Sequence, residues 1–183
     1  MPLESRRIAA FLLTQPDDNT WRRALIEDNL LQKKAPATAL RQAKLIRNRL
    51  NTLDVNAWEM IAHREQEIAI QLLLVAAIRH SQLLADFIND VYIDHQRRLN
   101  LAISPRDWDG FLTECAHRDL SVTRWSASTQ AKLFQVILRI LKEAKYLEST
   151  RSMKLTPQSL HPDVRRYLST QSDNSLVELL ERA

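Results

Sequence analysis

The part of this sequence best suited to chemistry is a run of positive charge with no negative charge beside it. No acidic residue lies between Asp28 and Asp54. The interval nevertheless holds six cations, Lys33, Lys34, Arg41, Lys44, Arg47 and Arg49. Helices usually gain solubility by mixing both signs, as in Glu–Lys pairs four residues apart. An uncompensated run is either a solvated basic face or a surface that contacts a polyanion.

The spacing within this run predicts an amphipathic helix from Pro36 to about Leu53, because proline suits the first helical turn. At about 100° per residue, one side of the helix collects the apolar residues Leu40, Ala43, Ile46, Leu50 and Leu53. The opposite side is polar and carries Arg41, Lys44 and Asn48. Arg47 lies on a flank, Arg49 lies off the basic face, and Leu45 is an apolar residue among polar ones.

A preceding helix is predicted to end near Leu31, so only the short connector QKKA separates the two helices. This is the layout of a helix-turn-helix DNA-binding unit, at about residues 20–53: a helix, a short turn, and a second helix with a basic outer face. In the first two turns of the second helix, side chains are placed to meet base edges, namely those of Ala37, Thr38, Arg41 and Gln42. Other cations are placed to hold phosphates. They are Lys33 and Lys34 in the turn, and Lys44 or Arg47 farther along the helix.

A second pattern of this kind occupies about residues 104–147. Ser104, Pro105 and Asp107 predict an N-cap, a proline at N1 and an acid at N3, which begin a helix that runs to about His117. After the connector RDLSVTRW, the next helix opens with three hydroxyls and a cation, Ser126, Ser128, Thr129 and Lys132. These groups suit phosphate oxygens, although serines at a helix start also act simply as caps.

The composition indicates an all-α fold with two helix-turn-helix units. Gly110 is the single glycine in 183 residues, and 45 % of the residues are hydrophobic. Sheets joined by tight turns need glycine where φ is positive, so a helical fold is favoured. The same scarcity excludes a phosphate-cradling loop, a dinucleotide fingerprint and a nucleophile elbow, each of which needs two or more glycines.

One cysteine, Cys115, excludes an intramolecular disulfide and fits a reducing cytoplasm. The longest apolar run, IAIQLLLVAAI at residues 68–78, would span only about 16 Å as a helix, too little for a bilayer. We therefore expect a buried core helix and no membrane association.

Charge is distributed unevenly along the chain and suggests two basic regions. The overall net charge is +4. Residues 1–53 carry ten Lys/Arg against five Asp/Glu, and residues 104–154 carry nine against six. We expect an N-terminal helical region at residues 1–103 with the first helix-turn-helix unit and core helices. A C-terminal region at residues 104–183 would hold the second unit and the tail helices.

Other candidate sites have weaker support. Cys115 and His117 cannot close a zinc site without a second pair of ligands, and residues two apart point to different faces of a helix. Asp86, Asp90 and Asp94 form an acidic stripe. Such a stripe fits a solvated helix face or a surface for a basic partner better than it fits a magnesium-dependent nuclease site. The four tryptophans fit core and helix-junction positions better than base-stacking platforms. No cofactor or metal is expected.

Three segments, NLLQKKAPATALRQAKLIRNRL, LLLVAAIRHSQLLADFI and WSASTQAKLFQVILRILKEAKYL, together resemble the BrxA family of bacterial BREX (bacteriophage exclusion) phage-defence systems. The resemblance spans most of the chain. It implies a small all-helical cytoplasmic protein with two helix-turn-helix units that binds double-stranded DNA. Thr38 and Arg41 match the family's Pro-Ala-Thr…Arg helix start, and Thr129 with Lys132 matches the second unit. Ala35 departs from the pattern, because serine is expected there as the N-cap.

These observations favour a non-enzymatic double-stranded DNA-binding component of phage defence, with other BREX proteins as possible partners. Two helix-turn-helix units in one chain make a monomer plausible, since single-unit readers usually dimerise. Two alternatives stay open, an RNA-binding helical module of the antitermination-factor type and a protein-interaction adaptor.

Overall fold

The computed structural model describes residues 1–183, and all of its regular elements are helices, which confirms the all-α prediction. Contacts group the chain into two compact units. The first unit comprises residues 1–80 and 161–167, and the second comprises residues 81–160 and 168–183. The division predicted after residue 103 falls inside the second unit. None of the helices, taken singly, combines the length and the apolar composition needed to cross a bilayer.

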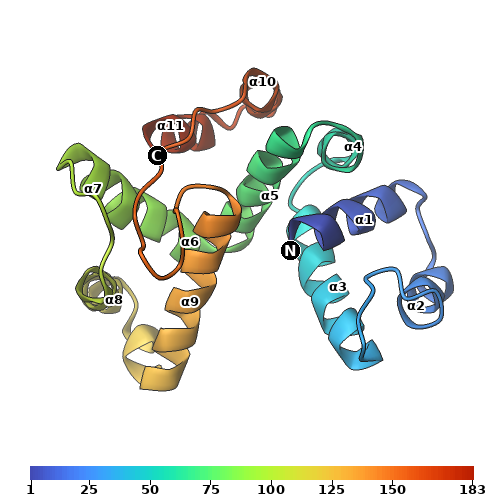
Figure 1. Cartoon of the computed structure of the whole chain (residues 1–183), viewed down its shortest axis with the longest axis horizontal. Coiled ribbons are helices and arrows are strands. Elements are labelled where there is room, and N and C mark those ends of the chain that lie inside the picture. The colour runs from blue at the N-terminus through green and yellow to red at the C-terminus, as the bar shows by residue number, and fades with distance from the viewer. The chain divides into compact units, whose positions relative to one another are not determined.

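The first unit is built around α5 (Gln66–His80), which α1 (Pro2–Leu13), α3 (Pro36–Leu50) and α4 (Val55–His63) contact. Figure 1 shows these helices together with α2 (Asp18–Ile26), which contacts α3. Every residue from Ile68 to Ile78 except Leu73 is buried, so the predicted core helix is confirmed. Its one polar member, Gln71, accepts a hydrogen bond of 2.8 Å from the backbone N–H of His161, which satisfies a buried amide.

The second unit starts with one helical run whose middle is wider than an α-helix. This run consists of α6 (Gln82–Phe87), a π-helix (Ile88–Tyr92) and α7 (Ile93–Arg97). It is followed by α8 (Pro105–Arg118), a 3₁₀-helix (Leu120–Arg124), α9 (Ala127–Glu143) and α11 (Asn174–Arg182). Helix α10 (Pro162–Thr170) contributes residues to both units.

Aromatic rings form the core of the second unit. The ring of Phe87 lies 5.8 Å from Trp108, 5.3 Å from Phe111 and 6.3 Å from Phe134. Trp108 and Phe134 stack at 5.1 Å, which fastens α8 to α9. Edge-to-face and offset contacts of this kind stabilise beyond the area that they bury. The predicted use of Trp108 as a core residue is therefore confirmed.

Two helix boundaries differ from those predicted. Helix α2 ends at Ile26 rather than near Leu31, because Asn29 adopts the left-handed conformation (φ 47°). The N–H of Leu30 then reaches back to the carbonyl of Ala24 at 3.0 Å. Helix α3 ends at Leu50 rather than at about Leu53.

The second unit makes one testable prediction about stability. The buried Tyr92 hydroxyl donates a hydrogen bond of 2.9 Å to the Tyr146 carbonyl, and the two rings meet edge to face at 5.6 Å. Tyr92→Phe removes the hydroxyl alone and should lower the free energy of unfolding by about 1 kcal/mol, measured by urea denaturation. Leu120→Ala, at a position that is 76 % exposed, is the control and should change little. Equal stability of Tyr92→Phe and the parent protein would contradict the assigned role of this bond.

Candidate nucleic-acid interface

Helices α2 and α3 form a helix–connector–helix arrangement at the position predicted for the first reader. Figure 1 shows α2 nearly end-on and α3 from the side, so the two axes cross steeply. Helix α2 is capped by Asp17, whose carboxylate accepts a hydrogen bond of 2.7 Å from the N–H of Thr20. The connector covers residues 27–35 and is longer than the predicted QKKA, because α2 stops early.

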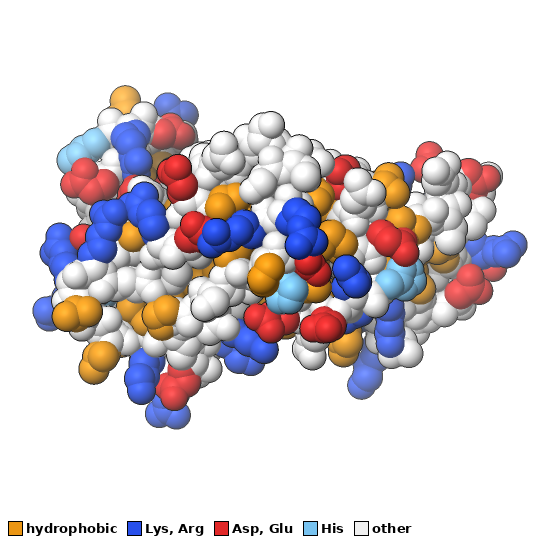
Figure 2. Space-filling model, turned by 90° about the horizontal axis from the view of Figure 1, so that it is seen from above, with side chains coloured by type: hydrophobic (Ala, Val, Ile, Leu, Met, Phe, Trp, Pro, Cys, Tyr) orange, Lys and Arg blue, Asp and Glu red, His pale blue; other side chains and the backbone are white.

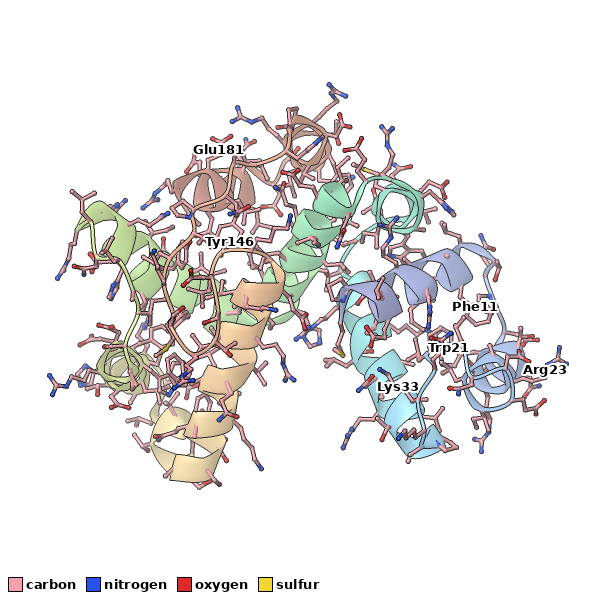
Figure 3. The ribbon with its side chains drawn as sticks, in the orientation of Figure 1. Phe11, Trp21, Arg23, Lys33, Tyr146 and Glu181 are labelled. Carbon is pink, nitrogen blue, oxygen red and sulfur yellow. The ribbon has the colours of Figure 1, made fainter.

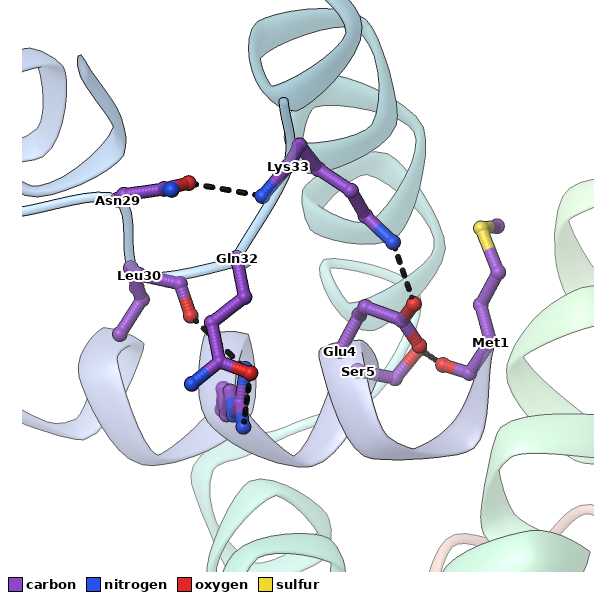
Figure 4. A network of polar contacts seen from close by, with 8 residues as sticks. Met1, Glu4, Ser5, Asn29, Leu30, Gln32 and Lys33 are labelled. Atoms are coloured by element: carbon purple, nitrogen blue, oxygen red, sulfur yellow. Dashed lines mark hydrogen bonds and ion pairs between the residues drawn. The ribbon is translucent and has the colours of Figure 1, made fainter. Parts of the chain in front are cut away.

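The connector is held against α1 by polar contacts, which Figure 4 shows at close range. The Lys33 ammonium donates to Glu4 of α1 at 2.7 Å. The Arg7 guanidinium donates to the carbonyl of Leu30 at 3.3 Å and to the side-chain oxygen of Gln32 at 3.2 Å. Lys33 was predicted to hold a phosphate. In the structure it is instead paired with a carboxylate that lies 29 residues away in the sequence.

Inside the connector, backbone geometry depends on two residues in the left-handed conformation. Asn29 has φ 47° and Gln32 has φ 53°. Asparagine tolerates this region better than most residues because its short polar side chain bonds locally. Here its oxygen accepts a hydrogen bond of 2.8 Å from the N–H of Lys33. The side chains of α1 and Asn29 together determine where α3 begins.

Helix α3 buries one face and exposes the other, as its spacing predicts. Its buried residues are Ala39, Ala43, Ile46 and Leu50. Ala39 takes the place predicted for Leu40, which is half-buried. The start of the helix is uncapped, because Ala35 makes no side-chain bond to it. Pro36 has no N–H, and the N–H of Thr38 donates to the carbonyl of Ala35 at 3.0 Å. The first turn therefore presents the N–H of Ala37 and the positive end of the helix dipole.

Three predicted cations are exposed around this helix and have no ion-pair partner: Lys34, Arg41 and Lys44. Lys34 lies in the connector just before α3, and Arg41 and Lys44 lie in the second and third turns of the helix. Leu45 is 36 % exposed beside them. On the face shown in Figure 2, basic and acidic side chains are interspersed.

Three other predicted residues are less accessible. Thr38, Gln42 and Arg47 are half-buried. The side-chain oxygen of Gln42 is buried without a hydrogen-bond partner, so a two-bond contact with adenine would need another rotamer. The Arg47 guanidinium lies 4.7 Å from the Trp21 ring centroid. Trp21 in turn stacks on Phe11 at 5.8 Å.

This stack joins one residue from each of the first three helices, and Figure 3 labels Phe11 and Trp21 in it. A guanidinium over an indole ring is attracted by the negative face of the ring. Arg47 therefore fastens α3 to α2 and is less free to reach a phosphate than Arg41. Sequence reasoning missed two exposed cations of α2, Arg22 and Arg23. Arg23 points away from the helix in Figure 3.

The second predicted reader consists of α8, the 3₁₀-helix and α9. Its start is a capping box, because Asp107 accepts hydrogen bonds of 2.7 Å from the backbone N–H and the hydroxyl of Ser104. Ser126 caps α9 by accepting from the N–H of Thr129 at 3.2 Å. The hydroxyls of Ser128 and Thr129 each lie 3.0 Å from that of Ser126.

The outer face of α9 carries a longer basic stripe than the sequence analysis proposed. Five exposed residues follow one another at three- and four-residue intervals, Ser128, Lys132, Gln135, Arg139 and Lys142. Such intervals place side chains on one helical face. The three cations among them have no ion-pair partner. Arg139 and Lys142 could have been found by extending the helical wheel beyond the first turn.

Cys115 gives no sign of thiolate chemistry. Its side chain is buried, and burial raises the pKa of its thiol above the usual value. A raised pKa favours the unreactive protonated form. No group of three or more His, Cys, Asp or Glu side chains is placed to hold a metal ion.

The contact between Glu4 and Lys33 makes a prediction about pH. The hydrogen bond from Lys33 lowers the pKa of the Glu4 carboxyl. Because the folded-state pKa is lowered, the stabilisation is fully present above the ordinary carboxyl pKa of about 4.3 and is lost as the pH falls through the lowered pKa. The Lys33 and Glu4 side chains remain about a quarter exposed (24 % and 22 %). The ion pair therefore contributes at most about 1 kcal/mol to the free energy of unfolding.

Urea denaturation of the parent protein and of Glu4→Gln at pH 7 and at about pH 3 measures this contribution. The parent should be the more stable at pH 7, and the difference should shrink at the lower pH. Glu65→Gln replaces an exposed glutamate and serves as the control. A difference that stays constant between the two pH values would show that ionisation of Glu4 contributes nothing.

Comparison with known proteins identifies the family. The BrxA family model matches residues 1–172. A BREX protein BrxA from Paramagnetospirillum magneticum is 34 % identical over 178 residues, which cover 97 % of this chain and 89 % of the relative. A BREX protein BrxA from Escherichia coli O9:H4 is 35 % identical, over 99 % of this chain and 85 % of the relative. A crystal structure of an uncharacterized protein from Magnetospirillum magneticum superposes with a TM-score of 0.89 at 32 % identity, covering 100 % of this chain and 93 % of that one. The chain therefore belongs to the BrxA family.

Proposed function

We propose that this chain is a non-enzymatic, double-stranded DNA-binding component of a BREX phage-defence system, with α3 as its main DNA-contacting helix. The observation that carries the proposal is the group of exposed, unpaired cations just before α3 and along its first three turns, Lys34, Arg41 and Lys44. Membership in a family whose relatives carry the name BREX protein supports the assignment to phage defence. Other BREX proteins are the proposed protein partners.

The chemistry of this group suits DNA phosphates. Each cation that neutralises a phosphate releases condensed counterions, which makes association favourable and dependent on salt. The uncapped first turn of α3 adds the backbone N–H of Ala37 as a donor, and helix N-termini commonly contact phosphates. Arg41 is the residue proposed to read a base, because a guanidinium can donate two hydrogen bonds to guanine. Thr38 lies beside it in the first turn, where its methyl group suits thymine.

The aromatic residues favour a duplex over single-stranded RNA. Readers of unpaired bases stack those bases on accessible aromatic rings. In this chain Trp21 stacks between Phe11 and Arg47, and Trp108 is buried. The indole N–H of Trp58 donates to the carbonyl of Leu50 at 2.8 Å. These three rings already serve the packing of the protein.

Helix α9 is proposed to add phosphate contacts through its basic stripe. Its N-terminal hydroxyls already hydrogen-bond one another and the first turn, so Lys132 and Arg139 are the stronger candidates for DNA contact. We propose that one chain supplies both helices and binds as a monomer. Light scattering during a duplex titration measures the stoichiometry.

Fluorescence anisotropy with a duplex, its single strand and a structured RNA of equal length tests the class of ligand. The proposal expects the duplex to bind most tightly. Preference for the structured RNA would favour an antitermination-type module instead. Absence of binding to all three would favour a protein-interaction adaptor.

Neutralising the α3 cations should weaken duplex binding. If Arg41 and Lys44 each contact one phosphate, Arg41→Gln with Lys44→Gln should reduce the slope of log K against log salt by about 1.8. Affinity should fall about tenfold or more near physiological salt. Arg97→Gln with Arg151→Gln makes the same change in net charge at exposed positions and is the matched control. If both double variants lose the same affinity, the effect of the α3 cations comes from net charge alone and not from their position.

The contribution of α9 is measured separately. Lys132→Gln with Arg139→Gln should also reduce the salt slope by about 1.8. Because phosphate contacts carry no sequence information directly, the loss should be similar for duplexes of different sequence. An unchanged slope would remove α9 from the proposed interface.

A further inference from the structure

Two strongly exposed leucines lie close together just after α7. Leu99 is 86 % exposed and Leu101 is 76 % exposed. Both line a hollow of about 420 Å³, together with Gln96, Asn100, Leu155 and Pro157. No charged residue lines this hollow. Single exposed leucines are ordinary on protein surfaces, whereas apolar side chains grouped around a hollow are typical of a binding site.

The end of α7 places Leu99 at a position that usually holds glycine. The N–H of Leu99 donates to the carbonyl of Gln96 at 3.0 Å, and the N–H of Asn100 donates to the carbonyl of His95 at 2.9 Å. These two bonds define a Schellman ending, in which the residue after the C-cap is left-handed and is usually glycine. Leu99 has φ 58°, a conformation that is unfavourable for leucine.

Helix α9 ends in the same motif with the residue types reversed. The N–H of Lys145 donates to the carbonyl of Lys142 at 3.1 Å, and the N–H of Tyr146 donates to the carbonyl of Leu141 at 2.8 Å. There the left-handed residue is polar and exposed, and the residue after it is buried, which is the stable arrangement. Leu99 instead adds strain and exposed apolar surface without stabilising its helix end, which indicates contact with another molecule.

Beside the leucines, three short segments pair through isolated β-bridges and leave one edge free. Residues 153–156 lie in the middle, with residues 101–103 on one side and residues 146–148 on the other. Ala102 is exposed, and its N–H and C=O make no hydrogen bond. An unpaired strand edge of this kind is a template for an added strand.

Alternation along the strands decides which side chains an added segment would meet. Leu101 and Leu155 line the hollow, so Ala102 and Lys154 point to the opposite face. Ala102 and Lys154 form a bridge without direct hydrogen bonds between them, the type of pair in which side chains lie closest. Lys154 is exposed and has no ion-pair partner. The small side chain of Ala102 lets Lys154 reach over the free edge.

The chain around the hollow is basic. Residues 95–106 and 149–162 contain no Asp or Glu. They contain five Lys/Arg, namely Arg97, Arg98, Arg106, Arg151 and Lys154. Arg98 is paired with Asp94. The remaining excess of positive charge favours an acidic partner, because interfaces match opposite potentials.

We propose that the hollow and the free edge bind an extended segment of a partner protein in which apolar and acidic residues alternate. Its backbone pairs with Ala102, and its apolar side chains enter the hollow beside Leu99 and Leu101. Its carboxylates point to the other face and meet Lys154. Strand addition of this kind obtains affinity from main-chain hydrogen bonds and specificity from alternate side chains. The inference concerns a protein partner and does not depend on DNA binding.

The charges disfavour two other occupants. In a two-fold dimer the same patch comes from both subunits, so Lys154 of one subunit would approach Lys154 of the other and like charges would oppose. A DNA duplex would satisfy the cations but leave Leu99 and Leu101 exposed, and no cation lines the hollow.

A peptide array tests the class of partner. Pentapeptides with blocked ends carry Leu, Ile, Val or Phe at odd positions and Asp or Glu at even positions. A second set replaces the acids by lysine, and a third keeps the composition but separates the apolar and acidic residues into blocks. The labelled full chain, without DNA, should bind the alternating acidic set most tightly. Equal or tighter binding of either other set overturns the proposal, as does binding to none.

Leu99→Asn with Leu101→Thr removes the apolar side chains and keeps the edge. Asparagine tolerates the left-handed conformation and threonine favours strands, so the variant should melt no lower than the parent protein. Fluorescence anisotropy with the tightest array peptide should show about tenfold weaker binding or more, with duplex binding unchanged. Leu120→Asn replaces another leucine that is 76 % exposed and should bind the peptide like the parent.

Equal peptide affinity in the double variant and the parent would overturn the proposal. Loss of duplex binding in the double variant would also overturn it, because the leucines would then belong to the DNA interface. Sedimentation velocity of both proteins tests the second copy as occupant. A dimer in the parent that dissociates in the double variant would overturn the acidic segment.

Lys154→Gln tests the charge contact. It should weaken binding of the acidic peptide about threefold and leave unchanged the counterpart that carries Asn and Gln in place of the acids. Arg151→Gln removes an exposed cation of the adjoining turn and should affect both peptides alike. An equal effect of Lys154→Gln on the two peptides would overturn the assignment of the carboxylates to Lys154.

Discussion

The ion pair between Lys33 and Glu4 is the contact on which the proposed interface depends. It fastens the connector before α3 to α1 at 2.7 Å, and Arg7 adds two hydrogen bonds to the same connector. A connector with two left-handed residues has several alternative conformations when it is free. These contacts select one, and α3 then begins at Pro36 with its charged side exposed. One cation of the basic run thus positions the others.

Helix α3 is held from two directions by different kinds of interaction. Its buried face, including Ala43 and Ile46, packs by the hydrophobic effect against neighbouring helices. Its flank is held by the stack of Arg47 on Trp21. The hydrophobic contacts tolerate changes of side-chain identity at similar volume, whereas the stack and the ion pair need particular residues. Orientation of the exposed cations therefore depends on a few polar side chains, and stability depends on many apolar ones.

Local patterns were sufficient to predict the helical class and most of the helix starts. Pro36, Ser104 with Asp107, and Ser126 each act in the structure as the spacing indicated. The long-range contacts could not be predicted, because nothing near Lys33 in the sequence shows that Glu4 will neutralise it. The early end of α2 was missed for a related reason. Asn29 is an ordinary polar residue in the sequence, and its left-handed conformation is stabilised by the fold around it.

The two proposed DNA-contacting helices differ in how their charge is arranged. On α3 the free cations Arg41 and Lys44 lie in the second and third turns, and the first turn is uncapped. On α9 they extend along the helix to Lys142, and the first turn is capped by Ser126. Base reading suits the first arrangement, since recognition helices meet base edges with their N-terminal residues. Phosphate contact suits the second.

Amide hydrogen exchange of the full chain with and without a saturating DNA duplex tests the central claim most directly. Residues 34–44 should exchange more slowly in the complex, because bound DNA covers the start of α3 and supplies an acceptor for the free N–H of Ala37. Helix α4 should be unaffected and serves as the internal reference. Slower exchange elsewhere in the chain, with residues 34–44 unchanged, would contradict the placement of DNA on α3.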